Sequence, residues 1–506
     1  MIYAFLITNM LFGQTLLART FGGTSWDGAF SIAQTADKGF IAAGSTYSYG
    51  ADREDFLVLK LNSDGSMSWA RTFGGPGYER ASSVTQTADG GYAIAGYTDS
   101  FGAGSVDFLV LKLDPDGSLE WARTFGGMED EWAHLVTQTA DGGFVVAGYT
   151  WSYGAGCDDF LVLKLNSDGS LIWARTFGGS GSEWASSATQ TADGGFVVGG
   201  NTNIGAGDSD FHILKLDSDG SLSWAGTFGG TLADVAHSVT QTADGGFVLA
   251  GYTRSYSGGD PDLLILKLNL DGSLIWARTF GGTDPDDAWS VTPTADGGCV
   301  VTGETLSYGA GWYECFIFKL ESDGSMSWAR TFGGTGSDWA HSVTQTADGG
   351  FVVAGYTWSY GAGNADLMIL KLDRNGNYPS CIQECSPIIG TLSLIASPPS
   401  VIAMDCSPST SSPNLTVITP SPIIMDVCQP LRLIEEEVLP GSGITCSPIS
   451  GGVLFFSPYD VGIRIYSVDG RLAYSGKLVK GENRIPIEAG IYLWTAGSYR
   501  GKMVIK

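Results

Sequence analysis

Short apolar segments separated by turn residues recur along the first three quarters of the chain. One unit contains Ser342–Thr346, Phe351–Thr357 and Asp366–Leu372, and the turn Ala347–Gly350 joins the first two segments. β-branched and aromatic residues next to Asp-Gly turns are typical of antiparallel hairpins. A fourth segment, seen in an earlier unit as Ser221–Ala225, completes the pattern. Four strands in roughly 50 residues predict one blade of a β-propeller.

This unit is repeated seven times. The string Thr-Phe-Gly-Gly recurs at intervals of 51 or 52 residues, and Arg precedes it in every copy except one, where Gly226 stands. The last unit ends at Tyr378 without its fourth strand, while Leu16–Phe21 is a fourth strand with no unit before it. One blade is therefore expected to use both ends of the repeat region, which closes a ring and removes two exposed sheet edges. We predict an all-β fold with a seven-bladed β-propeller over residues 15–378.

The repeat resembles a known family. The motifs are Trp-Ala-Arg-Thr-Phe-Gly-Gly, Asp-Gly-Gly-Phe-Val-Val-Ala-Gly-Tyr-Thr and Phe-Leu-Val-Leu-Lys-Leu-Asp-x-Asp-Gly-Ser, spread over residues 16–378. They are similar to the repeats of bacterial secreted β-propellers. The resemblance implies a cell-surface or extracellular module and brings no catalytic residues with it.

Composition narrows the range of functions. The chain has 506 residues and a formal net charge of −26, so a nucleic-acid partner is not expected, because phosphate binding needs clustered Lys and Arg. Residues 1–14 form an apolar stretch of signal-peptide length, although no Lys or Arg follows Met1. The alternative interpretation is a buried first strand. We expect a secreted or outer-surface protein.

Residues 379–450 differ in composition from the repeats. They hold 11 of the 18 prolines, and Ala403-Met-Asp-Cys406 and Ile424-Met-Asp-Val-Cys428 suggest a decayed short repeat. Such a segment is expected to be a semi-rigid linker, in which some β-structure can form. Disulfides are possible in an exported protein, and the spacing does not match a zinc site. Five of the eight cysteines lie here: Cys381, Cys385, Cys406, Cys428 and Cys446.

Residues 451–506 return to a β pattern and predict a small antiparallel β-sandwich. Ile465–Leu472, Ala489–Tyr492 and Gly501–Lys506 resemble the C-terminal sorting domain of type IX secretion substrates. That resemblance implies the type IX secretion machinery as a partner, although the Asn-Pro-Phe-like opening of that family is absent. The segment has eight Lys and Arg against four Asp and Glu, unlike the acidic propeller. A plain β-sandwich appendage is the alternative.

Strand direction alternates within a blade, so the long second-to-third loops share one face with the connections between blades. Loops on a rigid scaffold are common binding sites. Aromatic rings beside carboxylates suit carbohydrate recognition, because C–H faces stack on rings and acids accept hydroxyl hydrogen bonds. The alternative is that these rings fill gaps between blades. The candidate ligand-binding residues are Trp151, Tyr153, Trp312, Tyr313, Trp358, Tyr360, Trp132, Trp184 and Trp339.

Each connection between blades also carries a carboxylate two residues before an alanine. A ring of seven acids could bind a cation such as calcium, or sugar hydroxyls; capping of backbone N–H groups is the favoured alternative. The Asp-x-Asp-Gly segments, such as Asp114–Gly117, are predicted to be turns. The carboxylates are Asp27, Glu79, Glu131, Glu183, Asp234, Asp286 and Asp338.

Three histidines, His134, His237 and His341, occupy equivalent positions in non-adjacent blades, and we interpret them as polar strand residues rather than metal ligands. The chain contains no nucleophile elbow, P-loop, HExxH or dinucleotide fingerprint. We predict a non-enzymatic adhesion or glycan-recognition protein without a cofactor. The alternatives are an extracellular polysaccharide or peptide hydrolase and a purely structural surface protein. Only the sixth blade, with Asp284–Asp287, Glu304 and Glu314, departs from the repeat enough to suit a hydrolase.

Overall fold

The computed structural model describes residues 16–378 apart from 51–52, 204–206, 258, 310 and 362–363. Beyond residue 378 it describes the backbone of fourteen more strands, and residues 479–480. The chain divides into two compact units, Met1–Cys428 and Gln429–Lys506. The segment predicted to be a signal peptide lies outside the described residues. In the described part of the chain every regular element is a strand, and no helix suited to crossing a membrane is found.

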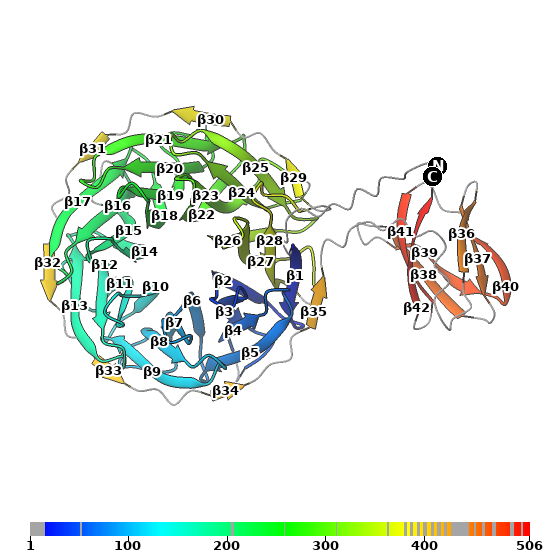
Figure 1. The fold of residues 1–506 in the computed structure, drawn as a ribbon, viewed down its shortest axis with the longest axis horizontal. Helices are drawn as coiled ribbons and strands as arrows, with labels where there is room; N and C mark the ends of the chain where they lie inside the picture. Colours follow the sequence, from blue (N-terminus) through cyan, green and yellow to red (C-terminus); the bar gives the residue numbers. More distant parts are fainter. Residues whose placement is uncertain are drawn as a thin grey trace, which may run out of the picture. The chain divides into compact units, whose positions relative to one another are not determined.

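Seven antiparallel sheets stand around a central channel in the first unit, as Figure 1 shows. This confirms the predicted seven-bladed propeller. The innermost strands are β2 (Asp27–Gln34), β6 (Glu79–Gln86), β10 (Glu131–Gln138), β14 (Glu183–Gln190), β18 (Asp234–Gln241), β22 (Asp286–Pro293) and β26 (Asp338–Gln345). The second strands are β3 (Phe40–Thr46), β7 (Tyr92–Thr98), β11 (Phe144–Thr150), β15 (Phe196–Thr202), β19 (Phe247–Thr253), β23 (Cys299–Thr305) and β27 (Phe351–Thr357).

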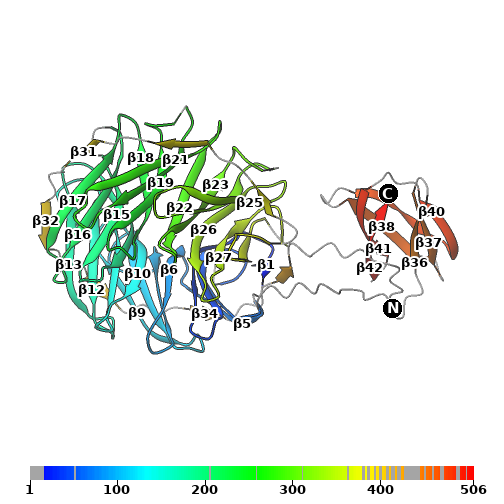
Figure 2. The same ribbon diagram turned by 45° about the horizontal axis from the view of Figure 1, so that its top comes forward.

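The other two strands of each blade lie farther from the channel (Figure 2). The third strands are β4 (Asp55–Leu61), β8 (Asp107–Leu113), β12 (Asp159–Leu165), β16 (Asp210–Leu216), β20 (Asp262–Leu268), β24 (Glu314–Leu320) and β28 (Asp366–Leu372). The fourth strands are β5 (Met67–Gly74), β9 (Leu119–Gly126), β13 (Leu171–Gly178), β17 (Leu222–Gly229), β21 (Leu274–Gly281), β25 (Met326–Phe332) and, for the seventh blade, β1 (Leu17–Gly22).

The N-terminal strand closes the ring as predicted. Strand β1 pairs with β28 in an antiparallel register that sets Leu17 opposite Lys371 and Phe21 opposite Leu367. In blades one to six a short Asp-Gly turn joins the third strand to the fourth, but in the seventh blade hydrogen bonds alone join them. Ring closure therefore depends on a strand that is remote in sequence.

The hydrophobic core lies between neighbouring blades. Phe56 and Phe73 of the first blade pack in one buried cluster with Ile94 and Leu111 of the second. The seventh and first blades meet in the same way, since Ile369 shares a cluster with Leu57. Each fully buried Phe or Leu contributes roughly 1.5–3 kcal/mol of transfer free energy. Every blade thus depends on its neighbours for its core.

Tryptophans of the fourth strands fill gaps between blades on the turn face. The Trp69 ring lies so close to Gly117 of the next blade that a Cβ atom at Gly117 would stand 3.0 Å from it. The φ of Gly117 is +82°, which glycine adopts without strain. The guanidinium of Arg71 covers the same ring at 5.6 Å and donates to the Asp116 carbonyl. The Asp-x-Asp-Gly segments are therefore turns that also form part of the contact between blades.

Residues 382–426, expected to belong to a linker, add a fifth strand to the outer edge of every blade. Each of seven short strands pairs antiparallel with one fourth strand. In Figure 1 they lie outside the blades all the way around the ring. We call these strands the belt: β29 (Ile382–Glu384), β30 (Ile388–Thr391), β31 (Ile395–Ser397), β32 (Ile402–Asp405), β33 (Ser409–Ser411), β34 (Thr416–Ile418) and β35 (Ile423–Asp426).

The second unit contains two small sheets. One has the order β36-β37-β40 and the other β39-β38-β41-β42. Its strands are β36 (Thr445–Ile449), β37 (Gly452–Ser457), β38 (Val461–Ser467), β39 (Leu472–Leu478), β40 (Gly481–Ile485), β41 (Gly490–Ala496) and β42 (Tyr499–Ile505). The side chains of the five cysteines after residue 378 lie outside the described residues. Among the described cysteines, Cys157 is exposed while Cys299 and Cys315 are buried thiols.

Candidate functional site

The face that carries the long loops also carries the carboxylate ring, but this ring is closed to ligands. All seven carboxylates are at most 1% exposed. Glu131 is representative: it accepts hydrogen bonds from the Gly127 N–H, the Thr150 hydroxyl and the Ser152 N–H at 2.6, 2.7 and 3.1 Å. The acids cap backbone N–H groups between blades, which is the alternative that we favoured from the sequence. The interpretation as an open ring for sugar hydroxyls does not fit this burial.

Each capping acid lies beside a second carboxylate. A Cβ atom at Gly126 would stand 1.7 Å from Oδ1 of Asp107 and 2.6 Å from Oε2 of Glu131, so the glycine separates the two acids. Burial, followed by the charge of Glu131, raises the pKa of Asp107 to about 6. The second glycine-separated acid of the fifth blade, Asp262, also has a pKa raised to about 6, first by burial and then by Asp286. The Gly after each Thr-Phe is therefore required by close packing against buried acids.

Three residues after each capping acid, the innermost strand has a β-bulge. In the third blade the register shifts between Ala133 and Leu135, which leaves His134 unpaired. A bulge of this kind redirects a side chain away from the regular pleat. The bulge residues are Phe30, Ser82, His134, Ser186, His237, Trp289 and His341.

Rings at these bulges contact one another from blade to blade. His237 stacks on Trp289 with centroids 4.2 Å apart, Trp289 meets His341 at 5.0 Å, and His341 meets Phe30 at 5.1 Å. The guanidinium of Arg80 lies 3.7 Å above the Phe30 ring. A nearly continuous aromatic surface therefore follows the inner strands from the fifth blade to the second.

The residue after each capping acid faces one residue of the second strand, and this pair differs between blades. Aromatic or small polar residues fill most of these positions, and the sixth blade alone places two acids opposite each other. The pairs are Gly28–Ser45, Arg80–Tyr97, Trp132–Tyr149, Trp184–Asn201, Val235–Tyr252, Asp287–Glu304 and Trp339–Tyr356. Like charges directly opposite in a sheet are destabilising, so this pair is not explained by stability.

The Asp287–Glu304 pair is held in a largely dry setting. Glu304 is 7% exposed and accepts a hydrogen bond from Trp289 Nε1 at 3.3 Å. Burial, and then the charge of Asp287, raises the pKa of Glu304 to about 8. Oδ2 of Asp287 lies 3.3 Å from His237 Nε2. At neutral pH the pair therefore combines a protonated Glu304 with an acidic neighbour that has a histidine beside it.

A pocket of about 260 Å³ opens over this pair on the loop face. Its walls include Tyr252, Arg254, Asp260 and Tyr313, and Glu304 and Asp287 form its polar part. Protonated Glu304 can donate a hydrogen bond and Asp287 can accept one. The two tyrosine rings offer flat apolar faces. This combination can bind a polyhydroxylated ligand, or act as a general acid and general base on one.

Three of the predicted ligand-binding residues are exposed tryptophans. Trp151, Trp312 and Trp358 are 54%, 72% and 51% exposed, and each lies in a long loop of this face. Tyr153 and Tyr360, two residues after Trp151 and Trp358, differ from these tryptophans because they have partners within the protein. Their hydroxyls donate to the Gly126 and Gly333 carbonyls at 3.1 and 2.8 Å. Those two tyrosines fix the loop to the blade connection.

The remaining predicted residues are half-buried among other rings. Trp132 packs 4.1 Å from Tyr97 and Trp339 lies 5.2 Å from Tyr313, while Trp184 is half-buried beside Asp158. Sequence reasoning did not single out the second-strand tyrosines or Arg80. The signal for the tyrosines was the Gly-Tyr-Thr string that ends the second strand in four blades; Ser45, Asn201 and Glu304 replace the tyrosine in the other three.

His237 and His341 lie in the aromatic surface, whereas His134 stacks on Tyr149 of its own blade with centroids 5.6 Å apart. Burial lowers the pKa of His134 to about 4 and that of His341 to about 3, so both are neutral at physiological pH. No group of three side chains able to hold a metal ion occurs within the described residues.

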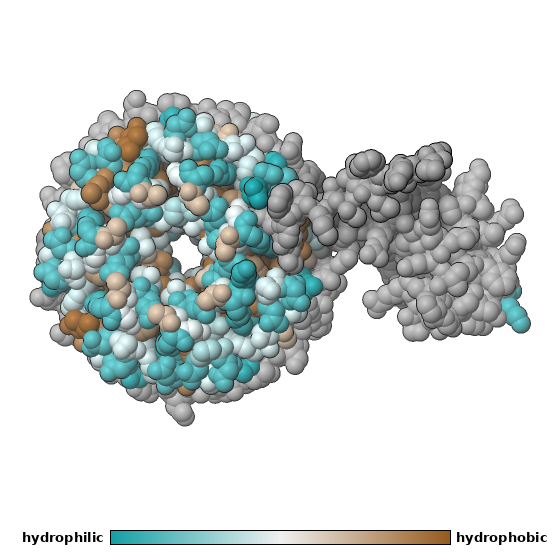
Figure 3. All heavy atoms as spheres, in the orientation of Figure 1, coloured by the Kyte–Doolittle hydropathy of each residue, from teal (hydrophilic) through white to brown (hydrophobic). Residues whose placement is uncertain are grey.

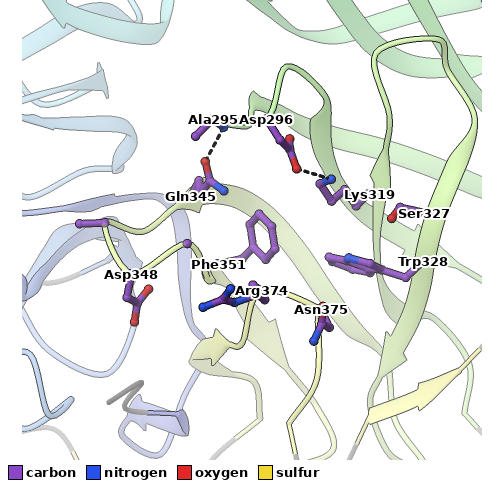
Figure 4. A pocket seen from close by; sticks show the side chains of 12 residues that line it. Ala295, Asp296, Lys319, Ser327, Trp328, Gln345, Asp348, Phe351, Arg374 and Asn375 are labelled. Carbon is purple, nitrogen blue, oxygen red and sulfur yellow. Dashed lines mark hydrogen bonds and ion pairs between the residues drawn. The ribbon is translucent and has the colours of Figure 1, made fainter. Parts of the chain in front are cut away.

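The turn face carries larger but repeated hollows. Figure 4 shows one of about 510 Å³ between the sixth and seventh blades, lined by Trp328, Arg374 and Phe351 among others. Its polar groups largely satisfy one another: Lys319 pairs with Asp296 at 2.6 Å, and the Gln345 amide oxygen accepts from the Ala295 N–H. A similar hollow lies between the fourth and fifth blades, lined by Lys215, Trp224 and Asp244. Because it recurs with the blades, we regard this hollow as a consequence of the architecture.

Figure 3 shows one face of the ring, with the channel open at its centre and separate brown patches on a mainly hydrophilic surface. Large hydrophobic side chains are therefore scattered on that face rather than joined into one interface.

Comparison with known proteins supports the repeat. A family described as a β-propeller domain of unknown function (DUF5122) matches residues 40–67, 87–120, 139–171, 191–222 and 242–274. These matches lie in the first five of the seven blades. The regulatory protein FlaEY of Caulobacter vibrioides is 24% identical over 159 residues, which cover 27% of this chain and 17% of FlaEY. The chain thus matches only about a sixth of that relative's length.

Solved structures with a similar fold have low sequence identity. Sqt1 of Chaetomium thermophilum is 11% identical with a TM-score of 0.42, covering 71% of this chain and 98% of Sqt1. The polysaccharide lyase Uly1 is 11% identical with a TM-score of 0.42, covering 69% of this chain and 90% of that protein.

Proposed function

We propose that this chain is a secreted or cell-surface adhesion protein that recognises a glycan on the loop face of its propeller. The observation that carries the proposal is the exposure of Trp151, Trp312 and Trp358 on long loops. Large aromatic side chains are costly to leave in water and are common anchors of binding sites. The pocket over Asp287 and Glu304 on the same face supplies hydrogen-bonding groups that suit sugar hydroxyls.

Export is part of this proposal. The resemblance of residues 451–506 to type IX sorting domains supports docking of that segment, as a β-sandwich, to the secretion machinery. Residues 1–14 have the composition of a signal peptide. We propose no cofactor and no nucleic-acid partner, in line with the net charge of −26.

The test is a glycan array and a polysaccharide pull-down with the full chain, each run with calcium and with a chelator. Binding that falls at least tenfold in a Trp151→Ala, Trp358→Ala double variant supports the proposal. Leu270→Ala is the matched control, since Leu270 is 54% exposed but lies in a turn on the other face. Equal losses in both variants, or no binding by the wild type, would contradict glycan recognition.

Hydrolysis is the second candidate, and the acid pair of the sixth blade favours it. A protonated Glu304 can give its proton to a leaving-group oxygen while Asp287 removes a proton from the attacking water. Under this candidate, release of reducing ends from a bound polysaccharide is abolished by Glu304→Gln and by Asp287→Asn, while binding remains. Binding without any product from the wild type would leave the non-enzymatic proposal.

A further inference from the structure

The belt matches the propeller in a strict seven-residue register. The Phe of every Thr-Phe-Gly stands opposite one belt residue, and these belt residues are seven positions apart. In chain order of the belt the pairs are Ile382–Phe332, Ile389–Phe280, Ala396–Phe228, Ala403–Phe177, Thr410–Phe125, Val417–Phe73 and Ile424–Phe21. One heptad of the belt therefore corresponds to one blade. Seven residues of fully extended chain reach about 23 Å, which is the upper limit that this spacing places on the distance from one outer edge to the next.

The belt also runs in a definite order. It starts on the sixth blade, passes the fifth, fourth, third, second and first, and ends on the seventh. Its last strand, β35, pairs with β1, where Thr20 stands opposite Met425. Strand β1 is consequently held on both sides, by β28 and by β35. The circuit is completed on the one blade whose fourth strand has no covalent link to its third.

We propose that residues 382–426 are an intramolecular partner that recognises the seven equivalent outer edges by strand addition and holds the ring closed at β1. We call the pairing of β35 with β1 the clasp. Main-chain hydrogen bonds supply the attraction in this mode of recognition, so the requirement is for extended residues at the right spacing rather than for a fixed side chain. That explains how a segment of varied sequence can serve seven blades. The inference does not depend on glycan binding.

Hydrogen exchange of the full chain tests the belt directly. In a strand paired on one side only every second N–H points to its partner, and we expect these amides of the seven belt strands to exchange at least tenfold more slowly than those of an unstructured peptide of the same sequence. Exchange at the rate of the free peptide would overturn the proposal.

A pair of proline variants tests the clasp. Ile424→Pro with Met425→Pro removes the N–H groups of adjacent residues in β35, so the ladder is broken whichever residue donates. Ala403→Pro with Met404→Pro makes the same change in β32, which pairs with β13 of the third blade. We expect the β35 variant to speed amide exchange in β1 (Leu17–Gly22) and β28 (Asp366–Leu372) at least tenfold. The β32 control should instead speed exchange in β13 (Leu171–Gly178).

Protection of the untouched blades shows in the same experiment that each variant is folded. Unchanged exchange of β1 in the β35 variant would overturn the clasp. Equal acceleration of β1 in both variants would do so as well, because the effect would then not depend on the place of the lesion.

Discussion

Replacing Glu304 by Gln is expected to remove a large pH dependence of stability. The pKa of this carboxyl is raised from 4.5 to about 8 in the folded protein, mainly by burial. Between those values the folded state holds a proton that the unfolded chain has released. The stabilisation from this group is therefore complete below pH 4.5 and is lost as pH rises through 8. At 1.36 kcal/mol per pH unit, the loss amounts to roughly 5 kcal/mol.

Glutamine is a suitable probe because it keeps the size of the side chain and an acceptor for Trp289 Nε1, but carries no charge. We expect the variant to match the wild type at pH 5 and to exceed its free energy of unfolding by several kcal/mol at pH 9. The assay is guanidinium unfolding at half-unit steps from pH 5 to 9, with the slope against denaturant compared at each pH. Asp284→Asn is the control, since Asp284 is exposed in the same connection.

A second variant separates the two causes of the raised pKa. Asp287→Asn removes the neighbouring charge but leaves the burial, so the pKa of Glu304 in the folded variant should lie below its wild-type value but above 4.5. The loss of stability should therefore end at a lower pH and be smaller than in the wild type. If Glu304→Gln and the wild type lose stability in parallel up to pH 9, the argument from burial is wrong.

Three further outcomes are expected. Asp141→Asn deprives Lys164 of a 2.9 Å ion pair and lowers the free energy of unfolding by about 1–2 kcal/mol at pH 7. Because the pKa of Asp141 is held at about 2, the wild-type advantage persists down to pH 4 and disappears toward pH 2 in urea titrations. Gly126→Ala forces a methyl group against two buried carboxylates and costs about 1–3 kcal/mol, measured as a lower melting temperature. Glu131→Ala leaves the Gly127 N–H and the Thr150 hydroxyl without the carboxylate that accepts from them, while the Ser152 N–H keeps the Thr150 hydroxyl oxygen as acceptor. It should cost more than Glu131→Gln in the same melting assay, since Gln retains one acceptor oxygen.

The blades could be predicted from sequence because their determinants are local and repeated. Asp-Gly turns fix the hairpins, and the interval between Thr-Phe-Gly-Gly strings fixes the number of blades. Closure by Leu17–Gly22 followed from counting strands, since one unit lacked a fourth strand and one fourth strand lacked a unit.

The belt could not be predicted in the same way. Its strands are only three or four residues long, which is short for a strand that must be recognised from sequence. They pair with edges that lie between 50 residues away, for Ile382 and Phe332, and 403 residues away, for Ile424 and Phe21. The strings around Met404 and Met425 suggested a short repeat, and they occupy equivalent register positions. Nothing in the composition indicated which surface that repeat would meet.

The candidate site was predictable in part. Departure from the repeat pointed to Glu304 and Asp287, but only the strand register shows that they stand opposite each other. Tyr153 and Tyr360 looked like ligand-binding residues because they are aromatic and lie in loops. Their recurrence at a constant position three residues after Thr was the better signal, because a repeated position suggests a structural contact.

The belt also changes the length of the tether between the two units. A free linker over residues 379–450 would have 72 residues and a contour of up to about 250 Å. With the chain bound to the blades as far as Asp426, only 18 residues remain before β36 begins at Thr445, or about 60 Å. Effective concentration rises roughly as the −3/2 power of tether length, so a fourfold shorter tether raises it about eightfold. Anchoring of the C-terminal unit would therefore confine the propeller to a smaller volume around the anchor than a free linker would allow.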